Sequence, residues 1–97
     1  MKRIRFTWDP DKAKINKRKH RISFEEARTV FYDDNARLRH DPDHSEEEDR
    51  FVLLGVSDRL RVLVVCHSYR SEDMEIRLIS TRKATKHERK QYEELLP

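Results

Sequence analysis

Apolar and polar residues alternate along several short segments of the chain, and a repeat of two residues is typical of half-buried β-strands. The alternation covers residues 3–8 and 36–40, and three more apolar segments follow at 51–56, 60–66 and 74–80. Short polar connections at 57–59 and 70–73 have the spacing of consecutive antiparallel hairpins. The residues from Leu63 to Cys66 are apolar on both faces, which predicts a central strand.

Three other segments begin with helix-capping signals. Asp9 precedes Pro10, while Ser23 and Thr85 each stand three residues before a glutamate, the spacing of a capping box. These signals predict helices at 10–20, 24–32 and from 85 to about 95. We therefore expect one α+β domain over residues 1–97, in the order β-α-α-β-β-β-β-α. Its antiparallel sheet is packed by an N-terminal helical hairpin and a C-terminal helix.

The composition narrows the class of protein further. The longest uncharged run, Val62 to Tyr69, is far shorter than the ~20 residues that span a bilayer, so we expect no membrane insertion. The basic N-terminus lacks the apolar segment of a secretory signal. The single Cys66 allows no intrachain disulfide and no thiolate metal cluster, which suits a cytoplasmic location.

Charged residues make up 42% of the chain and are segregated along it. Residues 1–23 carry a net charge of +7, residues 24–49 carry −7, and residues 50–97 carry +3. This layout indicates a polyanionic partner for the two ends and allows a cationic partner for the middle. The alternative is that the charges only form the solvated surface of a small domain.

The remaining candidate chemistry is cationic. One glycine excludes a P-loop and a dinucleotide-binding glycine motif, and no spacing of Ser, His and Asp indicates a hydrolase triad. The acidic segment 41–49 is more typical of a solvated loop than of a metal site. Four arginines lie at the ends or polar faces of predicted strands, where guanidinium groups can bind phosphate: Arg50, Arg61, Arg77 and Arg82.

RNA cleavage requires neutralisation of the charge on the phosphate, which such a cluster can supply, and a group that transfers protons. The candidates for proton transfer are His20, His44, His67, Tyr92 and Glu48. Each residue also has a structural alternative. An arginine can form a surface ion pair, His20 can complement the dipole of the first helix, and Tyr92 can be a half-buried aromatic residue.

Several strings in the sequence closely resemble the BrnT toxins. They include Trp8-Asp9, Lys19-His20, 23–27, 41–45 with Glu48 and Arg50, Arg77, 79–80, 82–84, Glu88-Arg89 and Tyr92. The resemblance runs from about Phe6 to Tyr92 in the same order and spacing. It implies a RelE-like fold and a metal-independent endoribonuclease that halts translation and needs no cofactor.

The resemblance also implies partners and site residues. The partners would be an RNA substrate and a BrnA-like ribbon-helix-helix antitoxin, which binds operator DNA and forms a toxin–antitoxin heterotetramer. We expect Arg50, Arg61, Arg77 and Arg82 to bind phosphate, with His20 and Tyr92 handling protons or stacking on bases. Further RNA contacts are expected from the basic residues Lys12, Lys19, Lys83 and Arg89.

Three positions depart from the pattern of the BrnT toxins. Arg21 stands where many relatives have glycine, Thr81 replaces an alanine, and the string 66–68 differs from the usual strand ending. Two other functions stay open at this point. The basic face could belong to a non-catalytic nucleic-acid-binding or repressor module, or the acidic loop could dock a basic partner protein.

Overall fold

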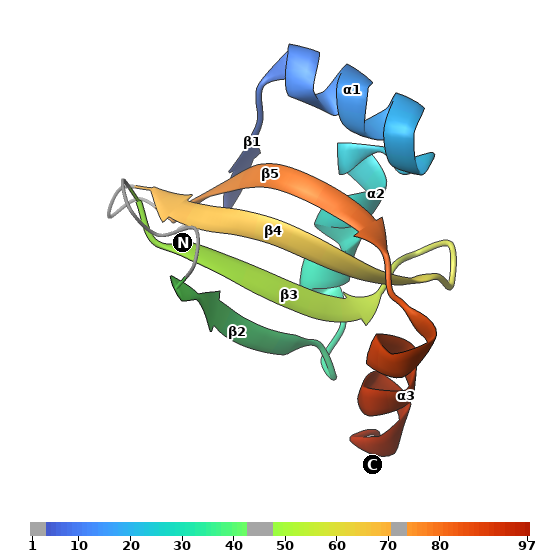
Figure 1. The fold of residues 1–97 in the computed structure, drawn as a ribbon. Helices are drawn as coiled ribbons and strands as arrows, with labels where there is room; N and C mark the ends of the chain where they lie inside the picture. Colours follow the sequence, from blue (N-terminus) through green and yellow to red (C-terminus); the bar gives the residue numbers. More distant parts are fainter. Residues whose placement is uncertain (1–3, 43–47, 71–73) are drawn as a thin grey trace.

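The computed structural model describes residues 4–42, 48–70 and 74–97, which form a five-stranded sheet and three α-helices (Figure 1). The elements along the chain are β1 (Arg5–Thr7), α1 (Pro10–His20), α2 (Phe24–Thr29), the 3-10 turn η1 (Val30–Tyr32), β2 (Arg37–Asp41), β3 (Arg50–Val56), β4 (Val62–Arg70), β5 (Glu75–Lys83) and α3 (Lys86–Glu94). The strand order in the sheet is β1-β5-β4-β3-β2. The expected α+β class is confirmed, and β4 is the central strand.

The sheet is mixed, so the expectation of a purely antiparallel sheet was wrong. β2, β3, β4 and β5 are antiparallel neighbours, but β1 pairs with β5 in the parallel direction. Two helices separate β1 from the later strands, and the chain crosses over before it returns to the sheet. Local alternation predicts a strand, but it carries no information about the direction of a distant partner.

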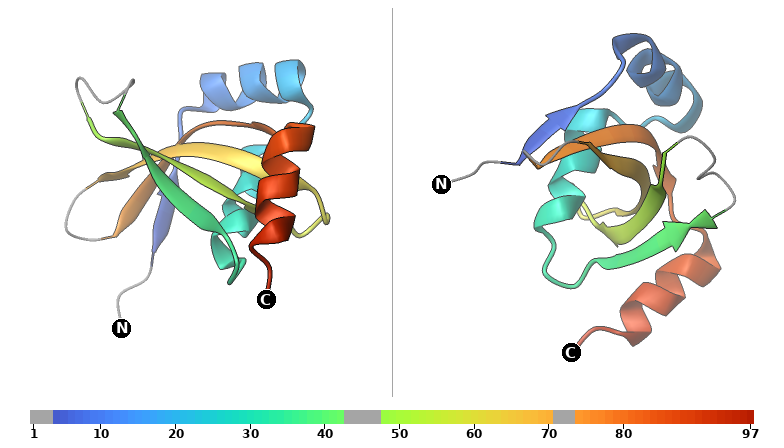
Figure 2. Two further views of the ribbon diagram at one scale, coloured as in Figure 1. Left: turned by 60° about the horizontal axis from the view of Figure 1, so that its bottom comes forward. Right: turned by 90° about the vertical axis from the view of Figure 1, so that its left-hand side faces the viewer.

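The two N-terminal helices serve different parts of the sheet rather than packing as one hairpin. Figure 2 shows α1 above the β5 edge and α2 across one face, with α3 on the opposite side. Arg21 joins α1 to α2 in the left-handed conformation, with φ of 61°. That conformation favours glycine, the residue that many BrnT toxins are expected to have at this position, and the structure gives no reason for the arginine.

The hydrophobic core lies between α2 and the sheet. Its fully or nearly buried members come from the chain around α2 and from the three strands β3, β4 and β5: Ile22, Phe24, Ala27, Val30, Leu53, Leu63, Val65, Ile76 and Leu78. Burying an aliphatic or aromatic side chain of this size contributes roughly 1.5–3 kcal/mol. We call this side of the sheet the core face and the opposite side the free face.

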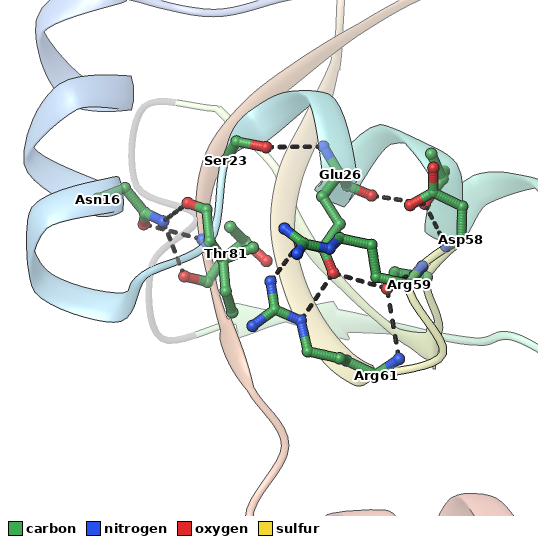
Figure 3. A network of polar contacts seen from close by, with 10 residues as sticks. Asn16, Ser23, Glu26, Asp58, Arg59, Arg61 and Thr81 are labelled. Carbon is green, nitrogen blue, oxygen red and sulfur yellow. Dashed lines mark hydrogen bonds and ion pairs between the residues drawn. The ribbon is translucent and has the colours of Figure 1, made fainter.

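Two polar networks fix the helices to the sheet (Figure 3). The Asn16 side chain accepts from the Thr81 amide at 3.0 Å and donates to the Thr81 carbonyl at 3.0 Å, so it continues the hydrogen bonding of the β5 edge. Glu26 of α2 accepts from Ser57 at 2.7 Å and from both Nε and Nη2 of Arg61. Burial opposes ionisation of Glu26, but the Arg61 and Ser57 hydrogen bonds outweigh it and lower its pKa.

A bulge in β5 changes which side chains reach the free face. Cys66 pairs with Ser80 and His67 pairs with Leu78, so Ile79 is an extra residue in the strand. Arg77 and Arg82 are five positions apart and would face opposite sides of a regular strand. The extra residue places both arginines on the free face.

No described helix is long and apolar enough to cross a membrane.

Candidate functional site

Three rows of side chains cross the free face of the sheet, as the strand register requires. The first row contains Asp41, Arg50, Ser68 and Arg77. The second row contains Arg39, Val52, Cys66 and Ser80, and the third contains Arg37, Leu54, Val64 and Arg82. The strands β2, β3 and β5 therefore place five arginines on one surface, around an apolar patch.

Two adjoining cavities lie on this face, with volumes of about 320 and 310 Å³. Both are lined by the same four residues, Asp41, Val52, Val64 and Arg82. One extends to Arg39, and the other extends to His20 at the end of α1. We call the two cavities together the cleft. It combines an apolar floor with two guanidinium groups, a carboxylate and two imidazoles, those of His20 and His40.

Arg82 is held at the cleft by a carboxylate of α3. Its Nη1 donates to Glu88 Oε1 at 2.8 Å, and its Nη2 donates to Glu88 Oε2 at 3.0 Å. Nη1 also donates to the Lys83 carbonyl at 3.3 Å. A guanidinium has five N–H donors, so the Nε–H and the second Nη2–H remain for a ligand.

The same contact stabilises the charges of both partners. The Arg82 hydrogen bonds lower the pKa of Glu88 to about 2, and the Glu88 hydrogen bond raises the pKa of Arg82. Glu88 also accepts from the backbone amide of Thr85 at 2.8 Å, completing the capping box of α3. The pair therefore stays ionised at neutral pH and sets the orientation of Arg82.

Comparison with known proteins identifies the family. The family described as "Ribonuclease toxin, BrnT, of type II toxin-antitoxin system" matches residues 8–88 of this chain. The chain belongs to the BrnT family. The crystal structure of the Brucella abortus ribonuclease toxin BrnT is similar, with a TM-score of 0.65 and 20% sequence identity. The match covers 87% of this chain and 100% of that chain. No curated protein matches the sequence significantly.

In this BrnT-family chain, the residues expected at the site divide into several groups. Arg82 and His20 line the cleft, and Arg50 and Arg77 lie on the same face in the first row. Arg50 sits opposite Asp41 in the register, and Arg77 is half-buried. Three of the four arginines, Arg50, Arg77 and Arg82, therefore share the free face, and of these Arg82 alone lines the cleft.

Arg61 is not brought together with the other three arginines. It lies just before β4, and its guanidinium forms an ion pair with the buried Glu26 on the α2 side of the sheet. The Glu26 hydrogen bond raises the pKa of Arg61. This contact closes the β3–β4 turn onto α2, so the structure gives Arg61 a role in folding and places it outside the cleft.

Tyr92 is also outside the cleft. Its side chain is buried, and its hydroxyl donates to Asp33 Oδ2 at 2.6 Å. Burial and the Asp33 contact raise the pKa of Tyr92 to about 12. A hydroxyl that is turned away from the cleft and holds its proton so strongly anchors α3, and it does not have the position of a proton donor or stacking residue there.

The other proton-transfer candidates have different surroundings. His67 is fully buried on the core face, where its ring lies 4.8 Å from that of Phe31, and burial lowers its pKa. Glu48 forms an ion pair with Arg70 at 3.2 Å. His44 lies outside the described residues. Among the candidates that the structure describes, His20 is the one that lines the cleft.

The four further basic residues lie at the surface around these elements. Lys12 and Lys19 are exposed on α1, Lys83 is exposed at the end of β5, and Arg89 is exposed on α3. The described part of the chain contains no group of His, Cys, Asp and Glu with the arrangement of a metal site. Most of the acidic segment, residues 43–47, lies outside the described residues.

Several residues of the site were not predicted as site residues from the sequence. Arg39 and His40 line the cleft from the edge strand β2, and Glu88 holds Arg82. The alternation at 36–40 already places Arg37 and Arg39 on one face of a strand, so the position of Arg39 on that face could have been predicted from the sequence. Glu88 was noted as a helix cap and as part of the resemblance, but its contact with Arg82 was not predicted because it depends on the approach of α3 to β5.

Proposed function

We propose that this BrnT-family chain cleaves RNA at the cleft without a metal ion and thereby inhibits translation. The observation that carries the proposal is the joint presence of Arg82 and His20 in one cavity, with Arg39 in the adjoining cavity. Cationic donors and a group that transfers protons are the two requirements of this reaction. Family membership supports the ribonuclease activity itself.

The proposed reaction is an internal transfer at phosphorus. The ribose 2′-oxygen attacks the adjacent phosphorus, and the bond from phosphorus to the 5′-oxygen of the next nucleotide breaks. The 2′-hydroxyl loses a proton and the 5′-oxygen gains one, so the products are a 2′,3′-cyclic phosphate and a 5′-hydroxyl. Arg82 neutralises the charge on the phosphate oxygens, and His20 transfers protons.

Basic residues beyond the cleft would bind the flanking phosphates. Arg50 and Arg77 continue the cationic surface along the free face, and the exposed residues of α1, β5 and α3 extend it: Lys12, Lys19, Lys83 and Arg89. Such contacts supply affinity without reading base sequence.

We also propose a BrnA-type ribbon-helix-helix antitoxin as the neutralising partner, in a cytoplasmic heterotetramer that contacts operator DNA through the antitoxin. Membership of a type II toxin–antitoxin family supports an antitoxin partner. An antitoxin gene beside this one would favour this part of the proposal.

The decisive experiment incubates the purified chain with a defined single-stranded RNA in excess EDTA. We expect cleavage to persist, and mass spectrometry should find 2′,3′-cyclic phosphate and 5′-hydroxyl ends. Cleavage abolished by EDTA would contradict the metal-independent reaction. Salt-sensitive binding without any new RNA ends would instead support a non-catalytic nucleic-acid-binding module.

A further inference from the structure

The helix α3 is held by three contacts with the rest of the chain. Glu88 binds Arg82 near the N-terminus of the helix, and Tyr92 donates to Asp33 in its last turn. Beyond the C-terminus, the Arg37 side chain donates to the Leu95 carbonyl at 2.8 Å. Contacts at both ends and in between hold α3 as a wall beside the sheet.

The side of α3 that faces the sheet is mostly polar, and it does not pack tightly on the apolar strands. A third cavity, of about 360 Å³, lies between α3 and the free face. Its α3 side is formed by Glu88, Gln91, Glu94 and Leu95, and its floor by Val52, Leu54 and Val64. A helix that only stabilised the fold would present apolar residues to such a floor. Polar residues where packing calls for apolar ones often mark a functional site.

The third cavity continues the cleft. It shares Arg39, Val52 and Val64 with the first cavity of the cleft, and its wall residue Glu88 holds Arg82. A group in this cavity would therefore be a near neighbour of a phosphate bound by Arg82.

The polar groups that remain available lie on opposite walls. Arg37 is engaged by Leu95 and Glu88 by Arg82. The side chains of Arg39, Gln91 and Glu94 have no hydrogen-bond partner among the described residues. The cavity thus offers donors from Arg39 on the β2 side and acceptors from Gln91 and Glu94 on the α3 side, above an apolar floor.

We propose that the third cavity is a base-specificity subsite that binds guanine next to the scissile phosphate, an inference that rests on the proposed function. Guanine has acceptors, O6 and N7, on one edge, and arginine is their usual partner. Its N1–H and N2 amino donors point toward another edge, where Glu94 and Gln91 can accept. Uracil lacks the amino group, while adenine and cytosine combine a donor amino group with neighbouring ring acceptors.

The test measures binding of GMP, IMP and AMP to the full chain by NMR, following the methyl groups of Val52, Leu54 and Val64. IMP lacks only the N2 amino group of GMP. We expect GMP to shift these methyl signals and to bind about tenfold more tightly than IMP or AMP. Glu94→Gln should weaken GMP binding about tenfold and leave AMP binding unchanged. The matched control is Glu93→Gln, since Glu93 is exposed on the same helix and lines no part of the cavity.

Equal binding of the three nucleotides, shifts confined to other residues, or equal effects of the two variants would overturn the subsite. Protection of the same methyl groups by an antitoxin, with no nucleotide binding, would identify a protein-docking groove instead and would also overturn it. RNA cleavage without guanine preference would reject the subsite and leave the proposed function intact. GMP binding at the cavity without RNA cleavage would reject the proposed function and leave the subsite intact.

Discussion

Two arginine–glutamate pairs lie on opposite sides of the sheet and differ in their exposure to solvent. On the core side, Glu26 is 4% exposed and Arg61 is 27% exposed. On the free side, Glu88 is 22% exposed and Arg82 is 43% exposed. The chemistry of the two contacts is the same, so their accessibility decides their use. The first pair fastens a turn to a helix, and the second holds an arginine at a cleft with two N–H donors still available.

The surroundings of the two pairs show the same difference. The core side is closed by α2, and Ser57 adds a hydrogen bond that completes the environment of Glu26. The free side is flanked by α3, whose polar residues leave a cavity above apolar strands. A protein that needed only stability would close both sides, so the open side is where we place function.

Replacement of Arg61 should have the largest effect on stability. Arg61→Ala leaves the buried carboxylate of Glu26 without its charged partner, which costs about 3 kcal/mol. Urea denaturation would measure this loss, and RNA cleavage per folded molecule should be unchanged. A loss below about 1 kcal/mol would mean that the core-side pair behaves like a surface ion pair.

Replacement of Glu88 should have a smaller, pH-dependent effect. Glu88→Gln removes the carboxylate that Arg82 and the Thr85 amide contact, with an expected cost of about 2 kcal/mol at pH 7. The folded pKa of Glu88 is about 2, below the ordinary value of 4.5. The stabilisation is therefore complete above pH 4.5 and is lost as the pH falls toward 2.

The measurement for Glu88 is the difference in free energy of unfolding between wild type and variant at several pH values. This difference should shrink between pH 4.5 and pH 2. A difference that stays constant over this range would contradict the Arg82–Glu88 ion pair.

A third variant addresses how α3 is held. Tyr92→Phe removes the hydrogen bond to Asp33 and should cost about 1 kcal/mol. Since the pKa of Tyr92 is raised to about 12 from 10, the folded state also loses stability in wild type as the pH rises from 10 to 12. Thermal unfolding at pH 8 and pH 11 would test both effects, because the variant should lack this contribution to the alkaline loss.

The smallest expected effect is a gain in stability from a change at the turn between α1 and α2. Arg21 has a φ of 61°, and His20 immediately before it lines the cleft. Arg21→Gly should relieve the left-handed strain and stabilise the chain by about 0.5 kcal/mol after the entropy of glycine is deducted. Cleavage should not change if α1 keeps its position. A loss of stability would show that the arginine side chain contributes more than the strain costs.

The sequence predicted the local elements well and the long-range contacts poorly. Alternation located the strands, and Asp9, Ser23 and Thr85 are the N-caps of the three helices. The expected capping box forms at Thr85 but not at Ser23, because the Glu26 carboxylate binds Ser57 and Arg61 instead. Strand 60–66 was placed too early, because Leu60 is 86% exposed in the turn and β4 extends to Arg70. The local pattern of apolar residues predicts which side of a strand is buried. The residues at which the strand begins and ends depend on the neighbouring turns, which the pattern does not specify.

The candidate site was predicted in part, for the same physical reason. Arg82 and His20 could be nominated by residue type, but the shared face of Arg77 and Arg82 depends on the bulge at Ile79. The pairing of Arg61 with Glu26 spans 35 residues along the chain. Such a contact is decided by the packing of α2 on the sheet, and nothing in the residues next to Arg61 signals it.

The most direct test of the account is the RNA cleavage rate of Arg82→Ala, with Lys90→Ala as a control on the exposed surface of α3. Primer extension would map the cleavage sites on RNA from cells. An assay of the purified protein on a defined RNA in EDTA would measure the cleavage rate per folded molecule. We predict that Arg82→Ala cleaves roughly 100-fold more slowly and that Lys90→Ala cleaves at the wild-type rate. Wild-type cleavage by a folded Arg82→Ala protein would contradict the placement of the reaction at the cleft.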